Sequence, residues 1–316
     1  MKTTYEPLHA KQILNGVKAP SMPFDWSINP YRGCQHGCSF CYARSTHAFL
    51  GLGTDDAFQH QILYKANAGE TLEKQLDKML RIRGGREKLA GRIAIGTATD
   101  PYQPIEAREQ LTRRCLEALA ARGLPVSVTT RSPLILRDLD LLRELPGSSV
   151  NISLNTMNKE VWRSFEPMTP SPEKRLEALA GLREAGVTAG IFLAPILPYL
   201  TDSEEELGAV VRRSREAGVS FIMGSPLRLS TREVKSWFFG TVREQYPALL
   251  SSYARLYAGS GYPSAPYRRE VRARLQTLLE KHGLPEYKPD PKGLEPVSAA
   301  APAESDTPVQ LSFVLD

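Results

Sequence analysis

Short apolar runs alternate with helical patterns along the middle of this chain, and this alternation most constrains the fold. The runs lie at 92–97, 125–130, 149–154, 187–194 and 219–223, and amphipathic periodicity fills 105–121, 134–145, 171–185 and 203–217. Apolar strands joined by crossover helices predict a parallel sheet. A further strand around Ile62 brings the count to about six units. The sequence therefore predicts an α/β fold, a partial (β/α)6 TIM-like barrel rather than a complete eight-fold one.

The segments on either side of this repeat have a different character. Residues 1–28 contain Pro7, Pro20 and Pro23 and predict an irregular N-terminal arm, so the core barrel is expected at 29–228. Helical patterns over 229–284 predict a C-terminal helical extension, whose aromatic side chains have the spacing of core packing. The Pro/Ala/Ser-rich residues 285–316 predict a flexible tail.

Composition limits the class of protein and its compartment. The chain is 41% hydrophobic and 24% charged, as in ordinary globular proteins. It has neither an apolar run of about eighteen residues nor a secretory signal pattern, so we expect a cytoplasmic protein with no membrane contact. The net charge of +5 is compatible with a polyanionic partner such as nucleic acid, although arginines on amphipathic helices are often only a solvated face.

Three of the four cysteines lie in one short loop. Cys34, Cys38 and Cys41 follow the spacing CxxxCxxC, and neighbouring glycines let the backbone curl. Three thiolates can hold a cubane iron–sulfur cluster and leave one iron open for a ligand. A zinc site completed by His36, His47 or Cys115 is the alternative, although common zinc modules have paired CxxC halves. Cys115 lies in a helical pattern, which favours a buried, inert thiol.

The segment NPYRGCQHGCSFCYAR, followed by GTATDPYQPIE, resembles the radical S-adenosylmethionine (SAM) superfamily. Within it, the chain is most similar to the spore photoproduct lyase-like group often labelled DNA repair photolyases, and to its bacterial Rv2578c-like family. The resemblance implies a [4Fe-4S] cluster on Cys34, Cys38 and Cys41, with SAM bound at the open iron. It also implies a reductase such as flavodoxin or ferredoxin as electron donor, and a 5′-deoxyadenosyl radical that abstracts hydrogen from a substrate.

The resemblance and the placement of polar residues after strands together predict the SAM site. The resemblance implies that Phe40, just before Cys41, occupies the family's aromatic position beside the adenine. Asp100 is expected to accept from the methionyl ammonium, for which Glu106 is an alternative, and Arg131 or Arg175 to pair with the carboxylate. The remaining expected contacts, to the methionyl group, the ribose or the adenine, are Thr99, Ser153, Asn155 and Ile196.

One departure from the group concerns the final hydrogen transfer. In spore photoproduct lyase, the cysteine that returns a hydrogen atom lies in the segment aligned with GTATD, where this chain has Thr97 and Ala98. Tyr102 and Tyr42 are the alternative donors. A nucleic-acid substrate is the leading hypothesis; RNA, peptide or small-metabolite modification, or a non-catalytic iron–sulfur or zinc module, are the alternatives.

Overall fold

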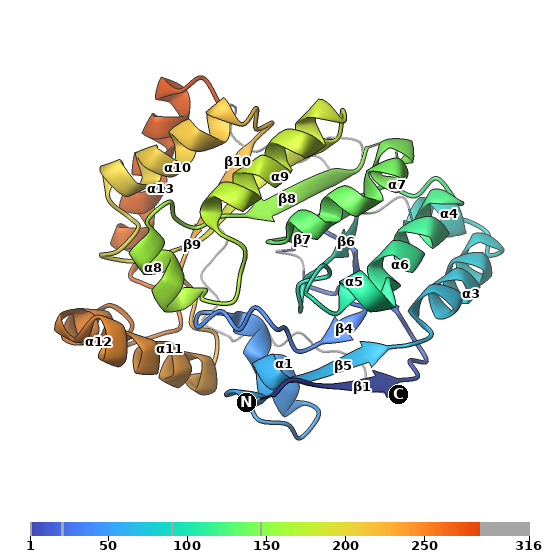
Figure 1. The fold of residues 1–316 in the computed structure, drawn as a ribbon, viewed down its shortest axis with the longest axis horizontal. Coiled ribbons are helices and arrows are strands. Elements are labelled where there is room, and N and C mark those ends of the chain that lie inside the picture. Colours follow the sequence, from blue (N-terminus) through green and yellow to red (C-terminus); the bar gives the residue numbers. More distant parts are fainter. Residues whose placement is uncertain (1, 20–21, 90–91, 146, 285–316) are drawn as a thin grey trace.

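A seven-stranded sheet in the order β10-β9-β8-β7-β6-β3-β2 forms the body of the computed structural model (Figure 1). The structure describes residues 2–19, 22–89, 92–145 and 147–284. Strands β10 to β3 are parallel to their neighbours, and β2 is antiparallel to β3. No pairing joins β2 to β10 in the described ranges, so the barrel is open. The predicted partial (β/α)6 fold is therefore confirmed. The strands are β2 (Leu14–Gly16), β3 (Trp26–Ile28), β6 (Ile93–Ile95), β7 (Val126–Thr130), β8 (Ser149–Ser153), β9 (Thr188–Ile196) and β10 (Ile222–Pro226).

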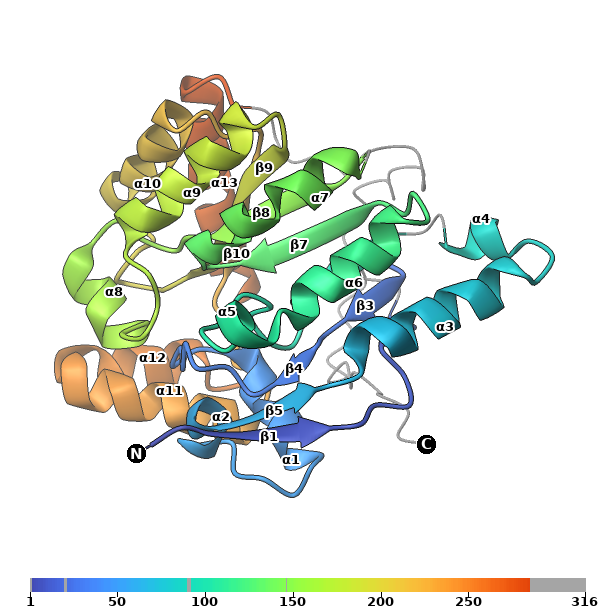
Figure 2. The same cartoon turned by 45° about the vertical axis from the view of Figure 1, so that its right-hand side comes forward.

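The sixth parallel strand is β3, not the strand predicted near Ile62. β3 lies within the predicted irregular arm, and its three residues pair with β6 in the register Trp26↔Ile93 to Ile28↔Ile95. A strand this short has no periodicity to detect, and its partner is far away in the sequence. The arm is thus partly strand, contrary to expectation. β5 (Gln61–Lys65) pairs instead with β1 (Thr4–Leu8) and β4 (Tyr31–Arg32) in a separate small sheet (Figure 2).

Helices cover the outer side of the large sheet, and the main apolar core lies between the two layers (Figure 1). Ser171 and Ser203 start two of these helices by accepting hydrogen bonds from Lys174 N and Glu206 N. The helix predicted over 105–121 is broken at Gln110, whose φ of 52° is left-handed. The helices in this part of the chain are α3 (Ala68–Leu80), α4 (Gly85–Leu89), α5 (Glu106–Glu109), α6 (Leu111–Ala120), α7 (Leu139–Glu144), α9 (Pro172–Glu184) and α10 (Glu204–Glu216).

A second, smaller core lies where α8 (Lys159–Phe165), α11 (Arg232–Gln245) and α12 (Leu250–Leu256) meet the cysteine loop. Phe165 stacks on Phe238, and Tyr253 meets Phe238 edge-on, so the aromatic residues are core residues as predicted. The last helix, α13 (Ala265–Lys281), packs against β10 and α10 instead. The predicted tail at 285–316 lies outside the described residues. Across the described part of the chain, no helix is both long and apolar enough to span a membrane.

Candidate active site

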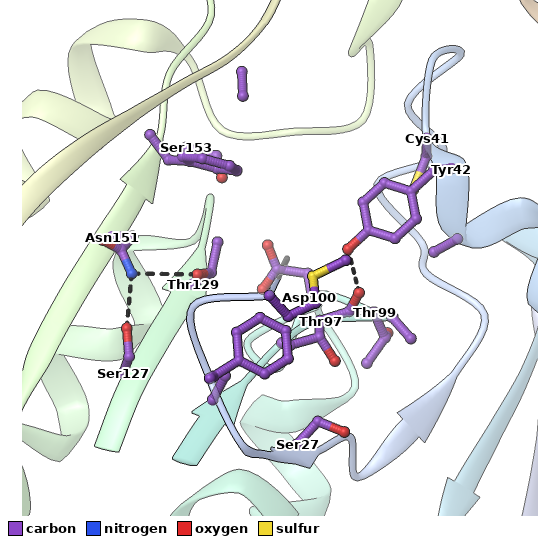
Figure 3. A pocket seen from close by; sticks show the side chains of 18 of the residues that line it. Ser27, Cys41, Tyr42, Thr97, Thr99, Asp100, Ser127, Thr129, Asn151 and Ser153 are labelled. Carbon is purple, nitrogen blue, oxygen red and sulfur yellow. Dashed lines mark hydrogen bonds between the residues drawn. The ribbon is translucent and has the colours of Figure 1, made fainter. Parts of the chain in front are cut away.

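A cavity of about 1970 Å³ occupies the inside of the open barrel (Figure 3). It is larger than ordinary ligand pockets, which hold roughly 300–1,000 Å³. Its lining includes the cysteine loop at the carboxyl end of the strands, and Ser127 and Thr188 near their amino ends. Closed barrels of this kind are usually filled by bulky branched residues. Here Ser27, Ser127 and Asn151 line the interior instead, which leaves it hollow.

The cysteine loop runs from β4 to the short 3₁₀ helix Tyr42–Arg44 and faces one end of this cavity. Cys34 and Cys38 are buried, Cys41 is partly buried, and all three are free thiols that line the cavity. Gly33 has a φ of +77°, and a Cβ there would lie 2.8 Å from the carbonyl oxygen of Gln61. The loop therefore needs glycine at this position to keep its path beside β5.

Arg44 fixes the shape of the loop from behind. Its fully buried guanidinium donates to the carbonyl oxygens of Gly37 (2.7 Å), Cys38 (3.2 Å) and Asp55 (2.7 Å). Its Cζ lies 4.4 Å from the centroid of the Trp237 ring. The sequence analysis missed this residue. Its place in the CYAR segment is the available signal, but the carbonyls it binds are visible only in the fold.

The donor set fits an iron–sulfur cluster. Burial raises the pKa of the Cys38 thiol well above its usual value; Arg131 opposes this rise, and Cys41 and Cys34 add to it, as closely grouped thiols do. Iron would stabilise the thiolates that burial disfavours. Among the described residues, no three cysteine, histidine, aspartate or glutamate side chains converge on the position of a single metal ion. Three thiols on one loop are the number that holds a cubane cluster with one open iron, whereas a structural zinc site takes four protein ligands.

Glu166 is the main site residue that the sequence did not indicate. Its buried carboxylate accepts from Arg131 Nε at 2.7 Å and from Arg175 Nη1 at 2.9 Å, and it lies 3.7 Å from Cys38 Sγ. Burial alone would raise the pKa of Glu166, but Arg175 and Arg131 together lower it. The residue follows α8 in no recognisable motif, so only the fold shows that it pairs with both arginines.

The two predicted carboxylate-binding arginines have different environments. Arg175 is buried, donates to the carbonyl oxygen of Ser153 at 3.0 Å as well as to Glu166, and does not line the cavity. Arg131 lines the cavity with 19% of its side chain exposed, and its Cζ lies 5.9 Å from the Phe40 ring centroid. The structure therefore brings Arg131 and Phe40 together, and leaves Arg175 behind the cavity wall.

Asp100 lies at the cavity wall with its carboxylate already bonded within the chain. It accepts from Thr130 Oγ1 (2.6 Å), from Tyr102 N (2.9 Å) and from Arg131 N (2.8 Å). His36 Nδ1 is 3.2 Å away. Burial would raise the pKa of Asp100, but His36, Thr130 and Arg131 N lower it to about 2. Asp100 therefore holds two strand ends and the cysteine loop together.

The two tyrosines expected to donate a hydrogen atom lie in different environments. The Tyr42 hydroxyl donates to the Thr97 carbonyl, and Tyr42 lines the cavity (Figure 3). Tyr102 is buried, donates to Asp138 Oδ2 at 2.9 Å, and borders a separate pocket of about 400 Å³. Of the two tyrosines, the structure thus brings Tyr42 alone to the large cavity.

The remaining predicted residues are only partly brought together. Thr99 and Ser153 line the cavity, and Thr99 Oγ1 donates to the Gly33 carbonyl at 2.6 Å. Ile196 packs in the main core, while its neighbour Pro195 lines the cavity. Asn155 is buried and does not line the cavity, and its amide oxygen and nitrogen have no hydrogen-bond partner among the described residues. Glu106 is buried and pairs with Arg137 at 2.7 Å.

Comparison with known proteins identifies relatives for most of the chain. The radical SAM superfamily model matches residues 28–210. The uncharacterized protein Rv2578c of Mycobacterium tuberculosis is 36% identical over 92% of this chain and 85% of its own length. The radical SAM Nα-GlyT isomerase of Pseudomonas phage M6 is 30% identical over 81% of this chain, but over only 51% of its own length. A spore photoproduct lyase complexed with dinucleoside spore photoproduct has the same fold, with a TM-score of 0.64 at 16% identity, covering 88% of this chain and 79% of the lyase.

Proposed function

This chain is an enzyme of the radical SAM superfamily, and we propose that Cys34, Cys38 and Cys41 hold a [4Fe-4S] cluster at which SAM binds. The observation that carries the proposal is the placement of three free thiols on one loop facing a large cavity. When bound and reduced by a donor such as flavodoxin or ferredoxin, the cluster and SAM supply a 5′-deoxyadenosyl radical that abstracts hydrogen from the substrate.

The residues around the loop would orient the cofactors and exclude water. Arg44 holds the loop carbonyls, and Glu166 fixes Arg131 beside Phe40. We assign to Arg131 the SAM carboxylate and to Phe40 the adenine, because both line the cavity next to the cysteines. The unpaired amide of Asn155 is suited to a polar ligand group, since buried amides rarely remain unbonded. Asp100 and Arg175 act as positioning residues, because their polar atoms already have partners in the chain.

The substrate we propose is nucleic acid, in a reaction related to lesion repair. Two observations support this choice: a solved structure of the same fold is a lyase complexed with dinucleoside spore photoproduct, and the chain has a net charge of +5. Apart from the cysteines of the loop, no thiol lines the cavity in the described part of the chain. Tyr42 is therefore our candidate for returning a hydrogen atom.

The decisive experiment is anaerobic reconstitution with iron and sulfide, followed by SAM and dithionite. We expect the visible absorption of a [4Fe-4S] cluster and formation of 5′-deoxyadenosine. Cys38→Ala should lose both. Cys115→Ala should keep both, because Cys115 is a buried thiol in the main core. A Cys38→Ala protein that retained the cluster and the product would contradict the assignment.

A further inference from the structure

Arg228 lies at the mouth of the cavity without a partner for its charge. It follows β10, lines the cavity, and makes neither a hydrogen bond nor an ion pair with any described residue. Its Nε is buried and unbonded, and the nearby Ser230 Oγ is buried and unbonded as well. Buried polar atoms without partners are uncommon in native proteins, and a group of them facing a cavity indicates a ligand.

The position of Arg228 is fixed by the protein rather than left to a mobile side chain. Its Cζ lies 5.0 Å from the centroid of the Tyr262 ring. Leu229 N donates to the Gly261 carbonyl at 2.8 Å, which joins the two segments that carry Arg228 and Tyr262. A Cβ at Gly261 would lie 2.4 Å from the Leu229 carbonyl oxygen, so this approach requires glycine. Because the side chain is already ordered on the ring, binding an anion would cost Arg228 little conformational entropy.

Its surroundings indicate that the anion belongs to the substrate. Arg228 lines the same cavity as Cys34, Cys38 and Cys41, so an anion bound to it would share this cavity with the proposed cofactors. Tyr262 is 41% exposed, which places the pair at the entrance. Glu233 also borders this region, but it is exposed in the first turn of α11, where water can solvate its carboxylate.

We propose that Arg228, held on the ring of Tyr262, binds a phosphodiester group of the substrate and so places one nucleotide in the cavity. The proposal rests on the proposed nucleic-acid substrate and adds the residue that recognises its backbone. Arginine is the side chain best suited to a phosphate, because its planar fork donates two parallel hydrogen bonds. A backbone contact of this kind positions the strand without reading its sequence.

The test measures binding of fluorescein-labelled single-stranded DNA and RNA oligonucleotides by the reconstituted full-length protein over a series of salt concentrations. Arg228→Gln should bind about tenfold more weakly at low salt, and the slope of log affinity against log salt should fall by about one. Arg228→Lys should keep the slope. The matched control is Arg212→Gln, an exposed arginine on α10 that does not line the cavity. It should behave as the unchanged protein does.

Further measurements separate this proposal from the proposed function. Cluster absorption and SAM affinity should be the same in Arg228→Gln and the unchanged protein. An unchanged slope in Arg228→Gln, or a loss of SAM affinity in its place, would overturn the phosphate assignment. Absence of oligonucleotide binding by the unchanged protein would also overturn it, even if 5′-deoxyadenosine still forms. If no 5′-deoxyadenosine forms but Arg228→Gln weakens binding as expected, the proposed cluster and SAM binding is refuted and the phosphate site stands.

Discussion

Two parts of the cavity wall differ in charge: the part beside the cysteine loop, at the carboxyl ends of the strands, and the part formed by the strands themselves. Beside the loop, Arg131 pairs with the buried carboxylate of Glu166. Along the strands, Ser27, Ser127 and Asn151 provide small neutral groups, and Asn151 Nδ2 donates to Ser127 Oγ at 3.0 Å (Figure 3).

This difference indicates that the two parts of the cavity wall have different roles. Buried ion pairs have strict geometric requirements, because a charge moved away from its partner is costly in a low-dielectric interior. The carboxyl end is therefore rigid where a cofactor must be placed accurately. Neutral hydroxyl and amide groups can exchange their bonds with water at little cost, so the wall along the strands provides volume without fixing what the cavity holds.

Of the three variants, Arg44→Leu should destabilise the protein most, because Arg44 holds the cysteine loop at the carboxyl ends of the strands. It leaves the carbonyls of Gly37, Cys38 and Asp55 without their donor, so we expect a loss of about 3 kcal/mol in the free energy of unfolding, together with incomplete cluster loading. Denaturant unfolding and iron content measure the two effects. Arg163→Leu, at an exposed position on α8, is the control and should stay within about 0.5 kcal/mol. Full iron content in Arg44→Leu would show that the loop does not need this arginine.

Thr130→Val should destabilise the same part of the cavity wall, because it removes the hydroxyl that donates to Asp100. The folded-state pKa of Asp100 is about 2, below its ordinary 3.8, so its stabilisation is complete above pH 3.8 and is lost as the pH falls towards 2. Removing the Thr130 hydroxyl raises the pKa of Asp100, so this loss should begin at a higher pH. We also expect about 1.5 kcal/mol less stability at neutral pH.

Thermal unfolding of the metal-free protein over a range of acidic pH values measures this change. Thr129→Val is the matched control, since Thr129 is the neighbouring threonine on β7 and lines the cavity instead of bonding to Asp100. Identical acid sensitivity in the two variants would show that Asp100 does not depend on Thr130.

Asn151→Ala should have the smallest effect, because it alters only neutral groups along the strands. It removes the bonds from Asn151 Nδ2 to Ser127 and Thr129, and water in the cavity can replace them. We expect a loss of about 1 kcal/mol and unchanged iron content. Iron content is the more informative measurement. Reduced iron content in Asn151→Ala would show that cluster loading depends on the wall along the strands as well as on the cysteine loop.

Much of the fold followed from local patterns. The strands β6 to β10 lie within a few residues of their predicted positions, because each is an apolar run beside a helical pattern. The membership of the sheet did not follow, since β3 is three residues long and is paired with a strand far along the chain. In the site, the polar residues after strands were found, but Glu166 was missed and Arg175 was expected to reach the cavity.

The cysteine spacing and the alternation of strands and helices can be read from the sequence, because both are local properties of neighbouring residues. How the charges pair depends on the tertiary structure. Glu166 meets Arg131 and Arg175 from 35 and 9 residues away in the chain, and this pairing leaves Arg131 facing the cavity and Arg175 behind it. The tertiary structure likewise leaves Arg228, at the cavity mouth, without an ion-pair partner among the described residues. Which charges are neutralised depends on which segments the sheet brings together, and no local pattern records that.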